Sequence, residues 1–131
     1  MQLAGETALD QNPRFCETVP FMQTEVTYTW QATIYLSGPL AVAEQVCREY
    51  CYSHGLCVTV SPTEFIYTGG EEVGVQVGLL QYPRFPKDVS ELEQTTRELA
   101  ETLRKAMVQH SVLIVFPHYT TWMTEREENA T

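Results

Sequence analysis

The chain of 131 residues is predicted to fold as α+β, with a four-stranded antiparallel sheet covered on one face by two helices. Four short stretches are rich in β-branched and aromatic residues, and in the first of them apolar and polar residues alternate with the period of a half-buried strand. Two further stretches carry apolar residues every three or four positions, as amphipathic helices do. A composition with 44% hydrophobic and 11% aromatic residues is typical of a globular core.

The first strand is expected over residues 25–37, where apolar side chains occupy every even position from Val26 to Leu36. The period then changes to that of a helix, which we expect to begin at Ser37-Gly38-Pro39, because proline suits the first helical turn. Gly55 is expected to end this helix. Its inward positions are Leu40, Ala43, Cys47, Tyr50 and Cys51.

The second and third strands are expected to form a hairpin. Residues 56–68 predict one strand interrupted at Pro62, and residues 72–80 predict the returning strand. Gly69-Gly70 is a hairpin-turn signal. A two-residue turn there would place Phe65 opposite Gly74.

The second helix is expected to open at Ser90-Glu91-Leu92-Glu93, which fits the capping-box pattern. The inward positions of this second helix are Leu92, Thr96, Leu99, Leu103 and Ala106. The last strand is expected over Val112–Phe116 and is apolar on both faces, ending before Pro117.

These elements suggest an N-terminal arm (residues 1–24), a single domain (25–123) and an acidic tail (124–131). Right-handed crossovers in a strand-helix-strand-strand-helix-strand chain predict the strand order 4-1-3-2. This is the ferredoxin-like βαββαβ fold, which hosts many unrelated functions.

The charge balance argues against several partners. The chain carries 17 acidic and 8 basic residues, a net charge of −9, and has no cluster of basic side chains. Nucleic-acid and anionic-membrane binding both depend on such clusters, so neither is expected. No leader segment and no apolar run long enough to span a bilayer is visible, which predicts a cytoplasmic protein with reduced thiols.

Cys47, Cys51, His54 and Cys57 form the densest group of possible metal ligands. Their spacing lacks the paired C-x2-C knuckles expected of structural zinc sites. The same positions form the inward stripe of a helix, and free cysteine is among the most buried residue types. We therefore predict free thiols, with no metal and no cofactor, although zinc and redox roles stay open as alternatives.

The stretches from Cys57 to Gly70 and from Gly78 to Pro86 resemble those of small ferredoxin-like proteins of unknown function that tailed bacteriophages encode. The resemblance would cover residues 25–123. It implies a bacterial cytoplasm during infection and no established activity.

The proline-rich loop from Tyr82 to Pro86 presents two aromatic rings and a guanidinium, which predicts an interaction site made of Tyr82, Arg84 and Phe85. A small anion bound by Arg84 and Lys87 at the second helix is an alternative, because helix N-termini attract anions. A third possibility is a packed loop whose Arg84 pairs with an acid of its own chain, such as Glu71 or Glu72.

The uncovered face of the sheet is expected to be neutral and rich in threonine, with apolar area added by Tyr35, Leu113 and Val115. Charged side chains on an exposed sheet suppress unwanted pairing, so their absence predicts that something covers this face. We expect a homodimer; the alternative cover is the segment from Phe15 to Met22.

Together these features predict a non-enzymatic, homo-oligomeric interaction protein whose protein partner the sequence does not identify. One alternative is a small-molecule or anion-binding module at the loop from Tyr82 to Pro86. A second is an enzyme with a site near Tyr67, Arg84 and His118. No nucleophile with an orienting partner is recognisable, so catalysis is not expected.

Overall fold

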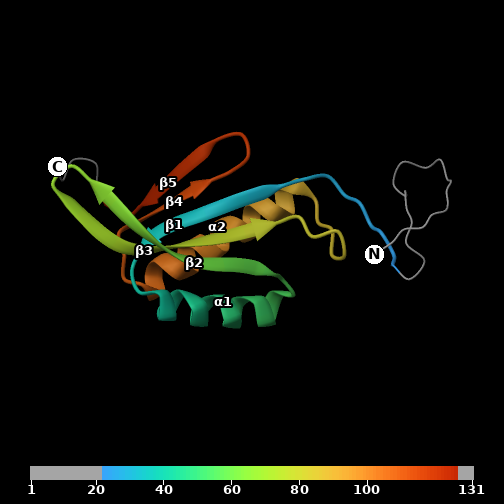
Figure 1. The fold of residues 1–131 in the computed structure, drawn as a ribbon, viewed down its shortest axis with the longest axis horizontal. Coiled ribbons are helices and arrows are strands. Elements are labelled where there is room, and N and C mark those ends of the chain that lie inside the picture. The colour runs from blue at the N-terminus through green and yellow to red at the C-terminus, as the bar shows by residue number, and fades with distance from the viewer. Residues whose placement is uncertain (1–21, 127–131) are drawn as a thin grey trace.

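The computed structural model describes residues 22–126, which form an antiparallel five-stranded sheet and two helices (Figure 1). Along the chain the elements are β1 (Gln31–Ser37), α1 (Leu40–His54), β2 (Val58–Tyr67), β3 (Gly70–Leu80), α2 (Val89–Ala106), β4 (Ser111–Val115) and β5 (Thr120–Thr124). The strand order is β2-β3-β1-β4-β5. The first four strands confirm the predicted ferredoxin-like α+β order, and β5 is an additional strand that was not predicted.

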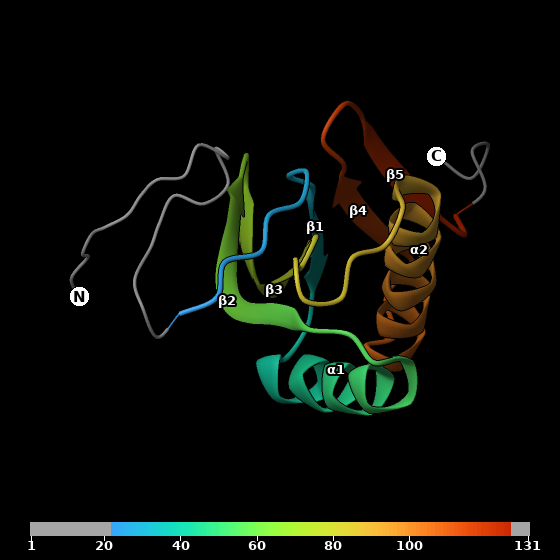
Figure 2. The same cartoon turned by 90° about the vertical axis from the view of Figure 1, so that its right-hand side faces the viewer.

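Both helices cover the same face of the sheet. α1 packs against β2 and β3, whereas α2 packs against β1 and β4 (Figure 2). The alternation in β1 places Ala32, Ile34 and Leu36 in the core, while the residues between them face away from the helices. The fully buried side chains come from both layers and include Ile34, Val75, Val77, Leu99, Leu103 and Ile114. Because both helices lie on this side of the sheet, neither helix covers the opposite face.

β1 is shorter than predicted because its partner ends. Gln31 pairs with Leu80, the last residue of β3, and the next contact is a hydrogen bond from the Gln81 amide to the Trp30 carbonyl. The alternation in the sequence extends over residues 25–30, but no strand within residues 22–126 pairs with them.

The hairpin differs from the prediction in its register. β2 runs through Pro62 without interruption, since proline is tolerated in an edge strand where its missing N–H can face solvent. The turn lies at Thr68-Gly69, one residue earlier than expected, so Phe65 pairs with Glu72 and not with Gly74. This two-residue slip along β3 leaves every side chain on its predicted face, because strands have a period of two.

α1 ends at Gly55 as predicted, in the left-handed conformation. α2 begins earlier than predicted: its cap is Asp88, whose carboxylate accepts a hydrogen bond from the Glu91 amide at 2.9 Å. The predicted cap at Ser90 is therefore wrong. Ala106 is exposed, and Met107 takes the inward position expected for it.

The predicted chain ends are only partly described. Thr124, placed in the acidic tail by the sequence, is the last residue of β5. Residues 1–21 and 127–131, which include most of the predicted arm and more than half of the predicted tail, lie outside the described residues. No helix between residues 22 and 126 is long and apolar enough to cross a membrane.

Candidate active site on the open sheet face

The open sheet face, the side of the sheet away from both helices, collects the side chains that the sequence predicted for it. Tyr35 of β1 pairs with Leu113 of β4, and Val115 pairs with Thr33. Trp122 of β5 pairs with Leu113 from the other side and is 59% exposed. The unpredicted strand therefore enlarges the apolar area of this face.

At the end of β1 this face is hollowed into a cleft of about 350 Å³, here called the open-face cleft. The β2–β3 hairpin projects past the helices on this side of the molecule (Figure 1). The cleft is lined by Tyr35, Leu36, Ser37, Phe65, Tyr67, Glu72, Gln109, His110, Ser111, Val112, Leu113, Trp122 and Arg126.

Aromatic rings form one wall of the open-face cleft. Tyr35 and Phe65 meet edge to face, with ring centroids 6.5 Å apart and planes at 66°. Phe65 lies over Gly74, where a β-carbon would collide with its ring, and Tyr67 lies against Gly70, where a β-carbon would be in tight contact with its ring, 3.0 Å from the nearest atom. The glycines of β3 thus give the rings of β2 room to lie across the strand.

Glu72 is the carboxylate of this wall. One of its oxygens accepts a hydrogen bond from the Tyr67 hydroxyl at 3.3 Å, and the other accepts one from the Ser37 hydroxyl. Desolvation and the neighbouring Glu72 carboxylate raise the pKa of the Tyr67 phenol, so the phenol stays protonated and remains a donor. These bonds orient a negative charge at the rim of an aromatic cleft, a combination that suits a cationic ligand.

The opposite wall carries basic side chains. β3 and β4 flank β1 on opposite sides. Glu72 therefore approaches the cleft from one side, and His110 and Arg126 approach it from the ends of β4 and β5. The cleft can accordingly take a ligand that bears both a positive and a negative group.

The structure does not bring together Tyr67, Arg84 and His118, the trio considered for an enzyme. Tyr67 lies at the Ser37 end of β1, whereas Arg84 and His118 follow β3 and β4 at the other end of the sheet. Glu71 and Glu72 lie at the start of β3 and Arg84 follows its end, so the possible pairing of Arg84 with these two acids does not occur.

The predicted interaction loop is exposed. Tyr82 and Phe85 stack with centroids 5.9 Å apart, and the Arg84 guanidinium lies 5.6 Å from the Phe85 ring. The main chain of Lys87 is held by the Gln81 side chain. None of these residues lines the open-face cleft. Anion binding by Arg84 and Lys87, like the interaction role of the loop, stays a prediction.

The thiols belong to a different groove. Cys47, Cys51 and Cys57 are free and line a hollow of about 360 Å³ between α1 and β2. Burial raises the pKa of the Cys47 thiol to about 11, so this sulfur is neutral and a poor nucleophile. Within residues 22–126 no three His, Cys, Asp or Glu side chains are grouped so that they could hold a metal ion.

Sequence reasoning identified part of the open-face cleft and missed the rest. Tyr35, Leu113 and Tyr67 were singled out, but Glu72 was considered only as a partner for Arg84, and Trp122 was not considered. The available signal was the hairpin itself: a tyrosine and a glutamate that flank a tight turn lie on one face and within reach of each other.

Comparisons with known proteins give structural neighbours only. No protein-family model matches the chain, and no curated protein matches it. A phage SAM lyase in its apo state superposes with a TM-score of 0.60 at 16% identity, covering 76% of this chain and 92% of its own. A phage SAM lyase in complex with S-methyl-5'-thioadenosine gives a TM-score of 0.62 at 14% identity, covering 81% of this chain and 98% of its own.

These neighbours change two conclusions from the sequence. The expected likeness to phage proteins is confirmed at the level of structure, but its implied lack of an established activity is wrong for both neighbours. The prediction of a non-enzymatic interaction protein is contradicted, because both neighbours are lyases and one of them binds a nucleoside. At these identities the likeness establishes the fold, and the activity of this chain is a separate question.

Proposed function

We propose that this chain binds S-adenosylmethionine in the open-face cleft and cleaves it to S-methyl-5'-thioadenosine. The observation that carries the proposal is the likeness to a phage SAM lyase in complex with S-methyl-5'-thioadenosine. The likeness favours small-molecule binding, which the sequence offered as an alternative. We assign this binding to the open-face cleft, in place of the loop between Tyr82 and Pro86.

The cleft contains groups that match the parts of this substrate. Tyr35, Phe65 and Trp122 offer aromatic surfaces on which an adenine ring can stack, a contact worth about 1–3 kcal/mol per base. Glu72 offers a charge for the ammonium group, and Arg126 on the opposite wall offers one for the carboxylate. The net charge of −9 also attracts a substrate that is cationic overall.

The chemistry explains why the sequence shows no catalytic nucleophile. When the carbon–sulfur bond of a sulfonium breaks, its electron pair goes to sulfur and a neutral thioether leaves without needing a proton. The other product can form from the substrate alone: an oxygen of its own carboxylate attacks the carbon that leaves sulfur, so a lactone closes as the carbon–sulfur bond breaks and no proton has to be transferred. The protein's task is then to hold the substrate in a reactive conformation, and that requires positioned binding groups more than a triad.

The position of Glu72 follows from the same reasoning. Positive charge on sulfur disappears as the bond breaks, so an anion beside the sulfonium would stabilise the substrate more than the transition state. The ammonium group keeps its charge throughout. We therefore assign the Glu72 carboxylate, oriented by Tyr67 and Ser37, to the ammonium group.

Turnover of S-adenosylmethionine tests this proposal, with S-methyl-5'-thioadenosine measured by chromatography. Glu72→Gln should lower kcat/KM by about 10- to 100-fold, the usual consequence of losing a hydrogen bond to a charged group. Glu71→Gln is the matched control, because it makes the same charge change on the other face of β3 and should leave kcat/KM unchanged. A wild-type chain that neither forms nor binds S-methyl-5'-thioadenosine would refute the proposal.

A further inference from the structure

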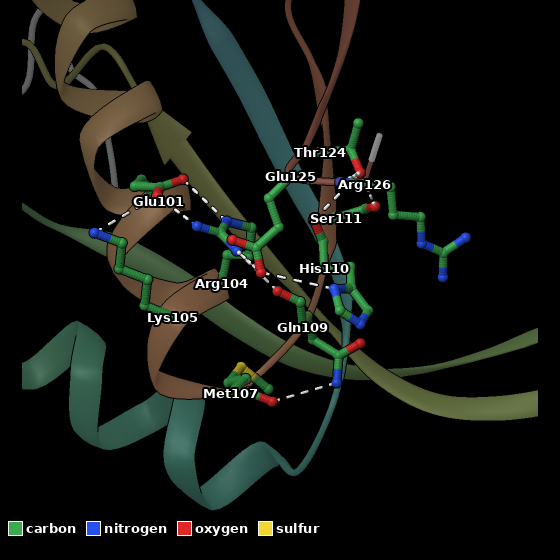
Figure 3. A network of polar contacts seen from close by, with 10 residues as sticks. All are labelled: Glu101, Arg104, Lys105, Met107, Gln109, His110, Ser111, Thr124, Glu125 and Arg126. Atoms are coloured by element: carbon green, nitrogen blue, oxygen red, sulfur yellow. Dashed lines mark hydrogen bonds and ion pairs between the residues drawn. The ribbon is translucent and has the colours of Figure 1, made fainter. Parts of the chain in front are cut away.

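Arg104, near the end of α2, is a buried arginine in a chain with few basic residues. Its side chain is 9% exposed, against 70% for the neighbouring Lys105. Its Nε and Nη2 atoms donate to the two oxygens of Glu101 at 3.0 and 2.6 Å, a bidentate pair within the helix (Figure 3). Half of the guanidinium is therefore used to fix the side chain itself.

The other half of the guanidinium reaches outside the helix. Nη1 donates to the main-chain carbonyl of Gln109 at 3.0 Å and lies 3.3 Å from a carboxylate oxygen of Glu125. Gln109 belongs to the connection between α2 and β4, and Glu125 directly follows β5. One side chain thus links the helix, the connection and the end of the sheet (Figure 3).

The connection needs such support. Val108 has a φ of 56°, the left-handed conformation, which is unfavourable for a β-branched residue. The amides that follow the helix donate back to it, Val108 to the Lys105 carbonyl and Gln109 to the Arg104 carbonyl. Strained backbone of this kind persists only where surrounding contacts hold it, and it is concentrated at functional sites.

The same connection forms the basic wall of the open-face cleft. Gln109 and His110 line both this cleft and the smaller cavity of about 260 Å³ beside Arg104. Glu125 completes the link, because its amide donates to the His110 carbonyl at 2.9 Å and its carboxylate lies 3.6 Å from His110 Nδ1. Arg126 is the next residue and also lines the cleft.

We propose that Arg104 is a positioning residue for the open-face cleft, holding Gln109, His110 and Arg126 in place from behind the wall. The effect on the substrate rests on the proposed function; the effect on the connection does not. Stability alone does not require an arginine here, because replacing a buried ion pair by apolar side chains of similar size is often neutral or stabilising. The guanidinium is needed for the hydrogen bond that it donates to Gln109 and for its ion pair with Glu125.

Amide hydrogen exchange on the full chain tests the positioning directly. In Arg104→Met the amides of Gln109 and Glu125 should exchange about tenfold faster or more, while the paired amides of β1 and β3 keep their protection. Lys105→Met is the matched control, since Lys105 also pairs with Glu101 but is exposed, and it should change neither amide. A folded Arg104→Met protein with wild-type protection at Gln109 and Glu125 would overturn the inference.

Glu125→Gln keeps the test decisive if Arg104→Met does not fold. It removes the exposed partner of the network and leaves the Arg104–Glu101 pair in place. The same two amides should exchange faster, by a smaller factor. Unchanged exchange in this variant would count against the proposal as well.

Kinetics with S-adenosylmethionine separate positioning from stability. Arg104→Met should raise KM about tenfold with little change in kcat, as displacement of a charged binding group does. A merely structural role would reduce the folded fraction, lowering apparent kcat with KM unchanged, and that result would overturn the inference. If the wild-type chain has no turnover, the proposed function fails and the exchange measurement alone decides the role of Arg104.

Discussion

At the scale of single residues, Gly74 decides how closely β1, β2 and β3 approach one another. A β-carbon there would lie 2.6 Å from the Leu36 carbonyl oxygen and would also collide with the Phe65 ring. Gly78, on the same face of the same strand, would meet the Thr59 hydroxyl at 2.6 Å. A hydroxyl can rotate away, but a backbone carbonyl in a paired strand cannot.

We therefore predict that Gly74→Ala destabilises the protein by about 1–3 kcal/mol, the usual cost of overpacking. Gly78→Ala should cost clearly less. Chemical denaturation of the two variants under the same conditions measures the difference. Equal stabilities would mean that β1 and β3 can separate at Gly74 at little cost.

At the scale of elements, the start of α2 shows how a sequence pattern can be correct and misplaced. Asp88 and Glu91 have the same spacing as Ser90 and Glu93, so the chain contains two overlapping capping-box patterns. The carboxylate of Asp88 caps the helix, and Ser90 donates to that same carboxylate at 3.2 Å. Local sequence alone does not choose between the two starting points.

Asp88→Ala is accordingly predicted to cost about 0.5–2 kcal/mol of stability, as the loss of a helix cap does. Ser90→Ala should change stability by no more than about 0.5 kcal/mol, the range of ordinary surface substitutions. Thermal unfolding of both variants distinguishes them. A larger loss for Ser90→Ala would restore the helix start expected from the sequence.

The strands show which parts of the fold were predictable. Stretches rich in β-branched and aromatic residues identified four strands, most clearly the first, where one buried face imposes a period of two; their order came from the right-handed crossover rule. Alternation has limits. It overestimated β1, since residues 25–30 alternate although no strand in the described part of the chain pairs with them, and it overlooked β5, which is short and lies next to a charged stretch. A strand ends where its pairing partner ends, and the residue pattern of one strand does not show where that partner ends.

The candidate site was less predictable than the fold for a related reason. The open-face cleft is assembled from five segments of the chain, and no short motif spans them. Tyr35 and Leu113 could be placed on the face by period alone. The role of Arg104 required knowing that α2, the connection and β5 end at the same corner of the molecule, which follows only from the topology.

At the scale of the whole molecule, both the net negative charge and the open-face cleft are consistent with a cationic small-molecule substrate. The acidic surplus that argued against nucleic acid is favourable for a cationic substrate. The predicted homodimer on this face stays a prediction. Trp122 adds to the apolar area available to it, and Leu113 belongs both to that area and to the open-face cleft.

The most direct test of the proposed site is an NMR titration of the isotope-labelled chain with S-methyl-5'-thioadenosine. We predict saturable shifts that cluster at Tyr35, Phe65, Tyr67, Glu72 and the Trp122 indole, with the thiol groove and the Tyr82 to Pro86 loop unaffected. No saturable shift, or shifts confined to Cys47, Cys51 and Cys57 or to Arg84 and Lys87, would contradict the assignment of the open-face cleft as the binding site.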